Sequence, residues 1–283
     1  DCAGGEYWNG ALNLVDTADG YSRWVPGHQG GESETILGKW LSMGGNREKV
    51  LVATKVGKPM GDGSRGLSRS RILRSAEESL RRLRTDRIDL YQSHEDDPGV
   101  PLEETLEAFA ELVRQGKVRA IGASNHSAGR LAQALDESRR LGLPSYCSLQ
   151  PLYNLYDRAV YEKDLRPLCI ERGLGVIPYF SLAAGFLTGK YRSEEELANR
   201  ARSGMVRNYL NERGFRILDA LDLVATETGS TPAAVSLAWL LARPEITAPI
   251  ASATNLRQLE QLVAATRLEL EPASLELLDL ASA

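Results

Sequence analysis

The chain has 283 residues, of which 42% are hydrophobic and 25% charged, an ordinary composition for a globular protein in water. Its formal net charge of −4 gives no reason to expect a nucleic-acid partner. No apolar run approaches the roughly 18 residues that a membrane span needs, so we expect no membrane partner. The three cysteines are few and widely spaced, which is typical of a reduced cytoplasmic protein, and the three histidines lack the paired spacing of a metal site.

Short apolar runs alternate along the chain with longer amphipathic stretches. The predicted strands are residues 12–15, 50–54, 88–92, 118–122, 146–149, 175–179 and 246–251. The predicted helices are residues 68–84, 102–115, 127–141, 162–172, 231–241 and 255–265. Gly116 and Gly173 follow two of these helices, where a left-handed residue is favoured. This alternation predicts a parallel sheet, and both a doubly wound sheet and a closed barrel fit it.

The start of the chain is short for a closed barrel. Residues 1–8 look like the end of a first strand and its loop, and the next strand begins almost at once. A parallel connection needs a crossover of about a dozen residues. We therefore expect that part of the first strand and helix is missing from the sequence near Asn9-Gly10.

Polar side chains stand where the predicted strands end. They are Asp16, Lys55, His94, Ser124 with Asn125, Gln150, Tyr179 and Ser252. In a parallel barrel the carboxyl ends of all strands meet at one rim, which is the face that carries active sites. This repetition along the chain predicts a functional site at that rim.

Four residues form a set that suits carbonyl reduction. A carbonyl that accepts a hydride also needs a proton, and Tyr21 can supply it, although a free phenol has a pKa of about 10. The Lys55 ammonium would lower that pKa, and Asp16 would keep Lys55 charged and oriented. His94 can donate a hydrogen bond to the substrate oxygen. Each residue alone is more often structural, so the prediction depends on the combination.

The chain resembles the aldo-keto reductase family, in particular the bacterial members near the channel β-subunits. The resemblance is carried by VDTADGY at 15–21, GESE at 31–34, TKVG at 54–57, DLYQSH at 89–94, GASN at 122–125, QPLYN at 150–154, GFLTGKY at 185–191 and the stretch 252–261. It implies a (β/α)8 TIM barrel, formed as a single domain by residues 1–283. It also implies an oxidoreductase that uses a nicotinamide cofactor on a small carbonyl or alcohol substrate.

The resemblance implies a role for individual residues. Tyr21 would be the acid/base, with Asp16, Lys55 and His94 completing a tetrad. Ser124, Asn125 and Gln150 would bind the nicotinamide amide, and Tyr179 would stack on its ring. The remaining cofactor contacts would come from Phe180, Ser181, Leu182, Gly185, Leu187, Lys190, Ser252, Thr254, Arg257, Gln258 and Gln261.

The sequence departs from the family pattern in ways that bear on the cofactor. Phe180-Ser181-Leu182 replaces the usual Ser-Pro-Leu, and Ala251 stands where a lysine often precedes Ser252. Arg257 and Ser252 can still hold a 2′-phosphate, because a guanidinium matches phosphate geometry. We therefore expect NADP(H) rather than NAD(H). Nothing in the sequence indicates an oligomeric state.

Two other functions stay open from the sequence. One is a cofactor-binding regulatory subunit with little turnover, similar to the potassium-channel β-subunits. The other is a barrel lyase or isomerase that forms a Schiff base on Lys55. For the substrate, Trp8, Trp24, Tyr153 and Tyr156 could form an apolar wall, or could pack in the interior.

Overall fold

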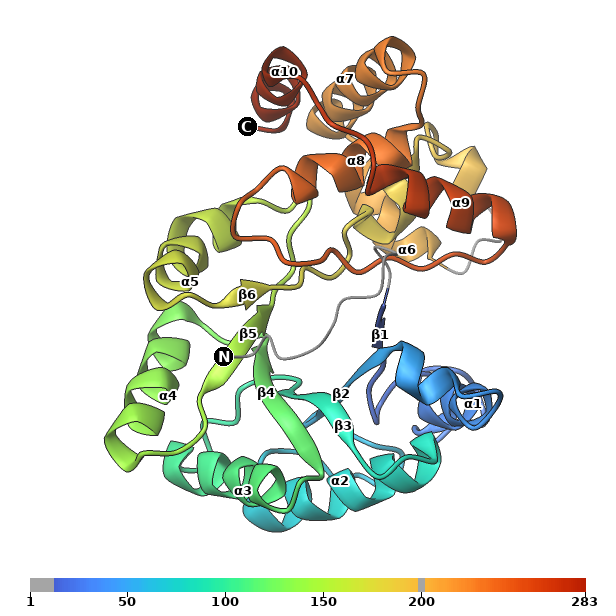
Figure 1. Ribbon diagram of the computed structural model, residues 1–283. Coiled ribbons are helices and arrows are strands. Elements are labelled where there is room, and N and C mark those ends of the chain that lie inside the picture. The colour runs from blue at the N-terminus through green and yellow to red at the C-terminus, as the bar shows by residue number, and fades with distance from the viewer. Residues whose placement is uncertain (1–12, 198–201) are drawn as a thin grey trace. The chain divides into compact units, whose positions relative to one another are not determined.

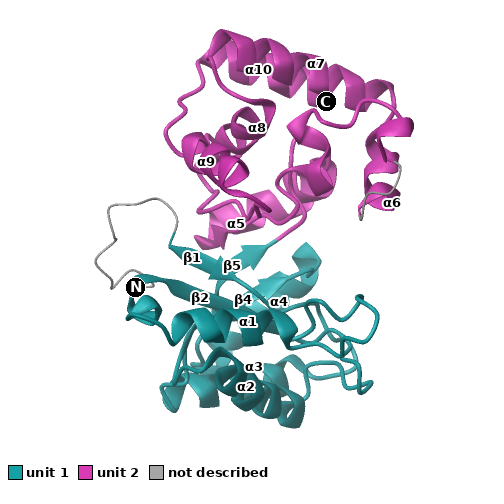
Figure 2. Ribbon diagram, turned by 90° about the vertical axis from the view of Figure 1, so that its right-hand side faces the viewer, with its two compact units in different colours: residues 1–150 teal, residues 151–283 magenta. Residues whose placement is uncertain are grey.

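The computed structural model describes residues 13–197 and 202–283, which group into two units. Residues 1–150 form the first unit and residues 151–283 the second (Figure 2). The expected gap near Asn9-Gly10 and the residue Trp8 lie outside the described residues. None of the helices in the described ranges has the length and apolar character that a membrane span requires.

The first unit is built on parallel strands that pair in chain order (Figure 1). They are β1 (Leu14–Asp16), β2 (Leu51–Val56), β3 (Ile88–Ser93), β4 (Val118–Ser124) and β5 (Tyr146–Gln150). All six residues of β3 are buried, as expected for a parallel strand covered on both faces. The register places Lys55 opposite Gln92 and Gln92 opposite Gly122, so the carboxyl ends of these strands lie along one edge.

Helices follow the strands of this unit and pack against one another in chain order. They are α1 (Glu32–Leu41), α2 (Arg69–Leu83), α3 (Leu102–Arg114) and α4 (Ala128–Leu141), with a 3-10 turn η1 (Asn46–Lys49). The side chains of Ser68 and Ser127 cap the starts of α2 and α4 by accepting a backbone N–H three residues on. The predicted boundaries of α2, α3 and α4 are confirmed to within one residue at each end.

Helix α1 is absent from the sequence prediction for a physical reason. It starts after Gly31, which has a φ of 90°, and buries Glu34, Gly38 and Leu41. A buried face that contains a carboxylate and a glycine does not show the apolar spacing by which an amphipathic helix is found.

The second unit is mostly helical. Its elements are η2 (Tyr161–Leu165), α5 (Arg166–Arg172), β6 (Gly175–Val176), η3 (Ala183–Thr188), η4 (Glu195–Leu197), α6 (Ser203–Val206), η5 (Arg207–Tyr209), α7 (Glu212–Glu227), α8 (Pro232–Leu241), α9 (Leu256–Ala265) and α10 (Pro272–Ser282). Thr231 caps α8 by accepting from Ala234 N. Gly173 ends α5 in a left-handed conformation, as the sequence predicts. Helices α7 and α10 are not among the predicted helices, although Ile217, Leu221 and Val224 form a buried helical stripe on α7.

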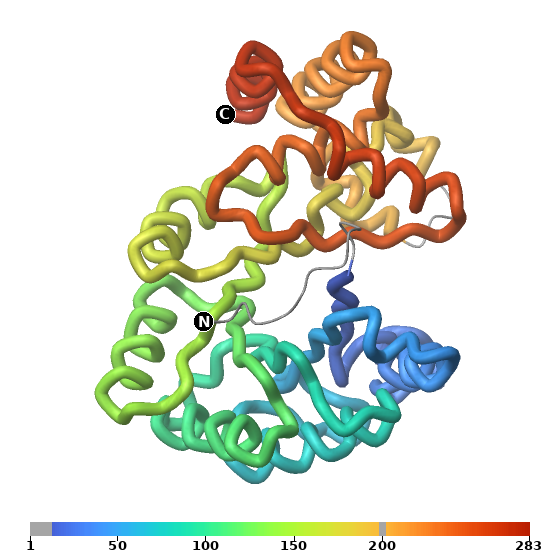
Figure 3. The backbone as a smooth tube through the Cα atoms, in the orientation of Figure 1, coloured from blue at the N-terminus to red at the C-terminus, as the bar shows by residue number. Residues whose placement is uncertain are grey.

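The last two predicted strands are wrong in extent. The strand expected at 175–179 shortens to β6, and that expected at 246–251 contributes a single bridge between Ile246 and Val176. Pro178 and Pro249 have no N–H group and so cannot continue a ladder. The two segments still run side by side (Figure 3), because Ile250 N donates to Pro178 O at 2.9 Å.

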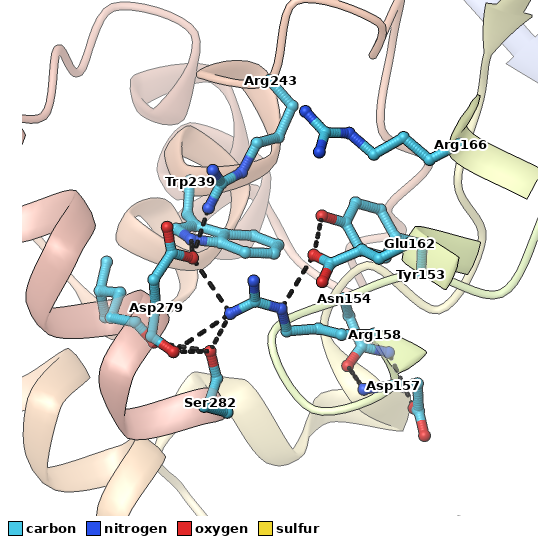
Figure 4. A network of polar contacts seen from close by, with 12 residues as sticks. Tyr153, Asn154, Asp157, Arg158, Glu162, Arg166, Trp239, Arg243, Asp279 and Ser282 are labelled. Carbon is cyan, nitrogen blue, oxygen red and sulfur yellow. Dashed lines mark hydrogen bonds and ion pairs between the residues drawn. The ribbon is translucent and has the colours of Figure 1, made fainter. Parts of the chain in front are cut away.

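A polar network fastens α10 within the second unit (Figure 4). Asp279 accepts from Trp239 Nε1 and pairs with Arg158 Nη1, each at 3.0 Å. The guanidinium groups of Arg158 and Arg243 lie 5.1 and 4.3 Å from the centroid of the Trp239 ring. Tyr153 packs against Trp239 and is 1% exposed, so it is a core residue and not part of a substrate wall.

Candidate active site

The polar residues predicted at strand ends in the first unit do lie along one edge of the sheet. Asp16, Ser124 and Gln150 are the last residues of β1, β4 and β5, Lys55 is the penultimate residue of β2, and His94 directly follows β3. The strands are parallel, so their side chains converge at the carboxyl edge. The structure therefore brings these residues together, while their roles stay predictions.

Lys55 is the centre of this arrangement. Its side chain is fully buried, and Nζ donates to Asp16 Oδ2 at 2.6 Å, to Thr17 O at 2.7 Å and to Tyr21 Oη at 2.8 Å. An ammonium has three N–H donors, and these three acceptors satisfy all of them. The Tyr21 hydroxyl also donates to Asp16 Oδ2 at 3.3 Å. A phenol, an ammonium and a carboxylate thus form one hydrogen-bonded group.

The pKa of Tyr21 shifts in the direction opposite to the one expected from the sequence. Burial raises the Tyr21 pKa above its ordinary value, and the Asp16 carboxylate raises it further. Burial lowers the pKa of Lys55, while Asp16 opposes that change. The expectation of a lowered Tyr21 pKa is therefore corrected, because burial and the nearby Asp16 carboxylate raise it. Tyr21 is a protonated phenol in neutral solution.

His94 is held next to Tyr21 as a neutral imidazole. The two rings meet edge to face, with centroids 5.7 Å apart. Burial lowers the His94 pKa to about 2, and the positive charges of Lys55 and Lys58 add to this effect. The backbone N–H of His94 donates to Val56 O at 2.8 Å, which fixes its place. A neutral histidine keeps one ring N–H and can donate it to a ligand oxygen.

A small cleft opens beside these two rings. It has a volume of about 160 Å³ and is lined by Gly20, Tyr21, Arg23, Trp24, Lys58, Pro59 and His94. Trp24 is 72% exposed, and its ring lies 6.1 Å from that of Tyr21. A larger hollow of about 460 Å³ lies at the start of α1, but none of the predicted site residues lines it. The cleft at Tyr21 is therefore the candidate site.

The residues predicted to bind the nicotinamide amide are joined to this group. Gln150 Nε2 donates to Asp16 Oδ1 at 2.9 Å, and Ser124 Oγ donates to the Gln150 carbonyl at 2.8 Å. Asn125 has a φ of 53°, and its Nδ2 donates to His94 O at 2.8 Å. These contacts fix three polar side chains on the same edge as Tyr21 and Lys55.

A buried ion pair that the sequence does not indicate supports the Tyr21 turn. Asp19 is fully buried, and its Oδ2 accepts from Arg71 Nη2 of α2 at 2.9 Å. The Asp19 backbone N–H donates to Lys55 O at 3.2 Å. Burial raises the Asp19 pKa to about 7, although Arg71 opposes this. Asp19 lies within the VDTADGY segment, but nothing in the sequence indicates Arg71 as its partner.

A second ion pair, between Glu34 and the partly buried Arg82, joins α1 to α2. Glu34 of α1 is fully buried and accepts from Thr54 Oγ1 at 2.6 Å and from Arg82 Nε at 2.7 Å. Thr54 precedes Lys55 on β2, and alternation along a strand sends these two side chains to opposite faces. The pair therefore anchors the outer face of the strand whose inner face carries Lys55.

In the second unit, Tyr179 begins a strained turn. Its N–H donates to Pro151 O at 2.9 Å, and Phe180 has a φ of 53°. Ser181 is buried, and its hydroxyl donates to Pro178 O at 3.0 Å. The backbone N–H groups of Phe180, Ser181 and Leu182 have no partner among the described residues. These three donors fit the predicted role of binding a cofactor phosphate.

The next segment, which includes η3, continues in unusual backbone conformations. Gly185 has a φ of 100°, and a Cβ there would lie 3.5 Å from Lys190 Nζ. Lys190 itself lies over the Tyr191 ring at 5.0 Å. The Leu187 side chain is fully buried, so Leu187 can offer a ligand only its backbone.

The predicted adenosine-binding residues surround the start of α9. Asn255 caps this helix by accepting from Gln258 N, and Gln258 Oε1 accepts from Thr254 N at 2.9 Å. Gln258 is thus used in the helix cap. Ser252 and Arg257 are exposed, and the Arg257 side chain makes no ion pair or hydrogen bond within the described ranges. Gln261 is half-buried one turn after Arg257.

The described part of the chain contains no group of three or more His, Cys, Asp and Glu side chains placed to hold a metal ion.

Comparison with known proteins gives consistent results. The model of the aldo/keto reductase family matches residues 9–283. The chain is 36% identical over 281 residues to the uncharacterized oxidoreductase YrpG of Bacillus subtilis, covering 97% of this chain and 84% of that protein. It is 34% identical over 262 residues to the aldo-keto reductase YhdN of the same organism, with 89% and 73% covered. A putative voltage-gated potassium channel subunit beta of Schizosaccharomyces pombe is 32% identical over 268 residues, with 91% and 76% covered.

Proposed function

Because this chain belongs to the aldo/keto reductase family, we propose that it is an oxidoreductase that reduces a small aldehyde or ketone with NADPH, or catalyses the reverse reaction. The observation that carries this proposal is the set of contacts that Lys55 Nζ makes with Asp16 and Tyr21 beside a cleft. A lysine used for Schiff-base chemistry needs a free amine, whereas all three donors of Lys55 are occupied. The contacts therefore favour reduction over the lyase alternative.

Protein groups in the first unit supply the proton and stabilise the developing charge. Reduced nicotinamide, when bound, supplies the hydride to the carbonyl carbon. The Tyr21 hydroxyl then donates its proton to the carbonyl oxygen, which yields the alcohol. Lys55 stabilises the phenolate that remains, and the neutral imidazole of His94 donates a hydrogen bond that orients the same oxygen. The raised Tyr21 pKa supports this direction, since the phenol is protonated beforehand.

The residues for the cofactor are those predicted from the family. Ser124, Asn125 and Gln150 would hold the amide, and Tyr179 would stack on the ring. The unpaired N–H groups of residues 180–182 support a pyrophosphate contact, and the exposed Arg257 supports NADP(H) over NAD(H). Comparing the dissociation constants for NADPH and NADH tests this preference, and tighter NADH binding would overturn it.

We also infer that the chain forms a single (β/α)8 barrel. The parallel order of β1 to β5 and the bridge between Val176 and Ile246 support this fold. A single barrel should unfold in one cooperative transition with coincident fluorescence and circular dichroism curves. Two separate transitions would indicate two independent domains instead.

The function is tested by replacing Tyr21 with phenylalanine. Y21F removes only the hydroxyl, so NADPH should bind with an unchanged dissociation constant while turnover of an aromatic aldehyde falls by about 100-fold or more, the usual contribution of a positioned acid. Stopped-flow or steady-state loss of NADPH absorbance measures turnover, and quenching of protein fluorescence measures binding. Full turnover in Y21F would show that Tyr21 is not the proton donor.

The similarity to a putative potassium channel β-subunit supports a second candidate function, that of a regulatory subunit. A regulatory subunit of that kind would bind the cofactor and turn over slowly. The wild-type protein distinguishes the two: cofactor binding without measurable aldehyde reduction would favour the regulatory function.

A further inference from the structure

Two positively charged side chains line the cleft beside Tyr21. Arg23 belongs to the loop after Tyr21 and is exposed, and Lys58 follows β2 and is half-buried. The lining contains no carboxylate. The cleft therefore combines positive charge with the Tyr21 and His94 side chains in one lining.

Neither cation is neutralised by its surroundings. The side chains of Arg23 and Lys58 make no ion pair or hydrogen bond in the part of the chain that the structure describes. Below them, Lys55 and Asp16 compensate each other at 2.6 Å. The positive charge of Lys58 lies near enough to His94 to contribute to the lowering of its pKa, and both residues line the cleft. Two uncompensated cations thus stand next to the groups that would meet a carbonyl.

We propose that this cleft selects carbonyl compounds that carry a carboxylate, with Arg23 and Lys58 holding the carboxylate while the carbonyl oxygen faces Tyr21 and His94. This inference rests on the proposed function and adds the substrate class. Charge-assisted hydrogen bonds from a guanidinium and an ammonium are the strongest contacts the lining can make. The exposed ring of Trp24 offers an apolar surface for the carbon skeleton between the two groups.

The size of the cleft favours a short substrate. Its volume of about 160 Å³ is below the roughly 300–1,000 Å³ of sites for drug-sized ligands. Because Arg23 is exposed and Lys58 is half-buried, salt should weaken the attraction between these cations and a bound carboxylate.

The test compares two aldehydes of nearly equal shape. 4-Formylbenzoate carries the carboxylate, and 4-formylbenzamide replaces it with a neutral amide. The wild-type holoenzyme should have a kcat/KM about tenfold or more higher for the benzoate, and its KM for the benzoate alone should rise with ionic strength. In K58M the kcat/KM should fall about tenfold for the benzoate and less than threefold for the amide. R23M should show the same pattern with a smaller loss, because Arg23 is exposed.

Matched variants outside the cleft control for the loss of a positive charge. Lys39 and Arg65 are exposed on the first unit and do not line the cleft. K39M and R65M should therefore leave the kcat/KM for both aldehydes unchanged. Equal kcat/KM for the two aldehydes in the wild type, or equal losses for both in K58M, would overturn the proposal while leaving the reductase function intact.

Failure of the reductase function gives a different result. If neither aldehyde is reduced with NADPH or NADH, the proposed function fails, and binding of 4-(hydroxymethyl)benzoate then tests the cleft alone. Quenching of Trp24 fluorescence, identified by its loss in W24F, should report weaker binding in K58M than in K39M. Equal affinity in these two variants would overturn the carboxylate site.

Discussion

The Arg71 guanidinium lies 2.9 Å from Asp19 Oδ2, and Asp19 stands two residues before Tyr21. Both side chains are at least nine-tenths buried. The Asp19 backbone also donates to the Lys55 carbonyl, so one residue ties helix α2 to the Tyr21 turn and to the strand that carries Lys55. The pair can therefore set the distance between the Tyr21 phenol and the Lys55 ammonium without touching a substrate.

Replacing Arg71 tests this positioning role. In R71M the free energy of unfolding should fall by about 3 kcal/mol, because a buried carboxyl loses its partner. The kcat for aldehyde reduction should fall about tenfold, while the NADPH dissociation constant stays within twofold. R71K keeps the charge and should recover part of the kcat. A variant that loses stability but keeps the wild-type kcat would show that the pair has a structural role alone.

His94 should make the protein sensitive to acid. Its pKa is about 2 in the folded protein and about 6.5 when unfolded, so the unfolded state binds the proton as the pH falls below 6.5. Stability from His94 is complete above that pH and is lost toward lower pH. Between pH 7.5 and 5 the loss should be about 2 kcal/mol. Urea unfolding at the two pH values should show that H94N loses about 2 kcal/mol less than the wild type.

Asp19 provides a control, because its contribution to stability should change with pH in the opposite direction. Its pKa of about 7 lies above its ordinary value of 3.8, so the folded state binds the proton first and gains stability as the pH falls through 7. D19N removes that gain and should lose more stability than the wild type over the same pH range. The same response in H94N and D19N would contradict these assignments.

The polar edge of the sheet could be predicted from the sequence, because the strands and the polar residues at their ends are both local sequence patterns. Short, mostly buried runs, LVATKV and IDLYQS, mark β2 and β3. The polar residue at or just after the end of each run, Lys55 or His94, is fixed by chain order. The pKa of Tyr21 could not be predicted, since it depends on burial and on Asp16, which only the folded chain defines. The partner of Asp19 lies 52 residues away on another element and leaves no local pattern.

Close packing of α1 on α2 gives a stability prediction. A Cβ at Gly38 would lie 2.0 Å from the Arg82 carbonyl oxygen, which belongs to the backbone and cannot move aside easily. G38A should therefore lower the free energy of unfolding by about 2 kcal/mol or more. Gly129 of α4 has nothing within 4 Å of the same position, so G129A should be neutral or raise stability by up to about 1 kcal/mol. Equal urea midpoints for the two variants would contradict this packing.

Asn154 should control the turn that begins at Tyr179. It is fully buried, and its Nδ2 donates to Phe180 O at 3.0 Å and to Asp157 Oδ2 at 2.9 Å, while its Oδ1 accepts from the backbone of residues 156 and 157. Phe180 has a left-handed backbone conformation. This costs about 1–3 kcal/mol, so it persists only where surrounding contacts compensate for the cost. The side chain therefore keeps the unpaired N–H groups of residues 180–182 in place.

N154D distinguishes the role of the Asn154 amide donor from that of its acceptor oxygen. It keeps the acceptor but loses the donor to Phe180 O, so the turn should relax and the NADPH dissociation constant should rise about tenfold, measured by fluorescence quenching. T231A serves as the control, because it removes the cap of α8 and lowers stability by about 1 kcal/mol without touching the turn. T231A should bind NADPH like the wild type. If N154D does so as well, the proposed dependence of NADPH binding on the contact between Asn154 and Phe180 O is wrong.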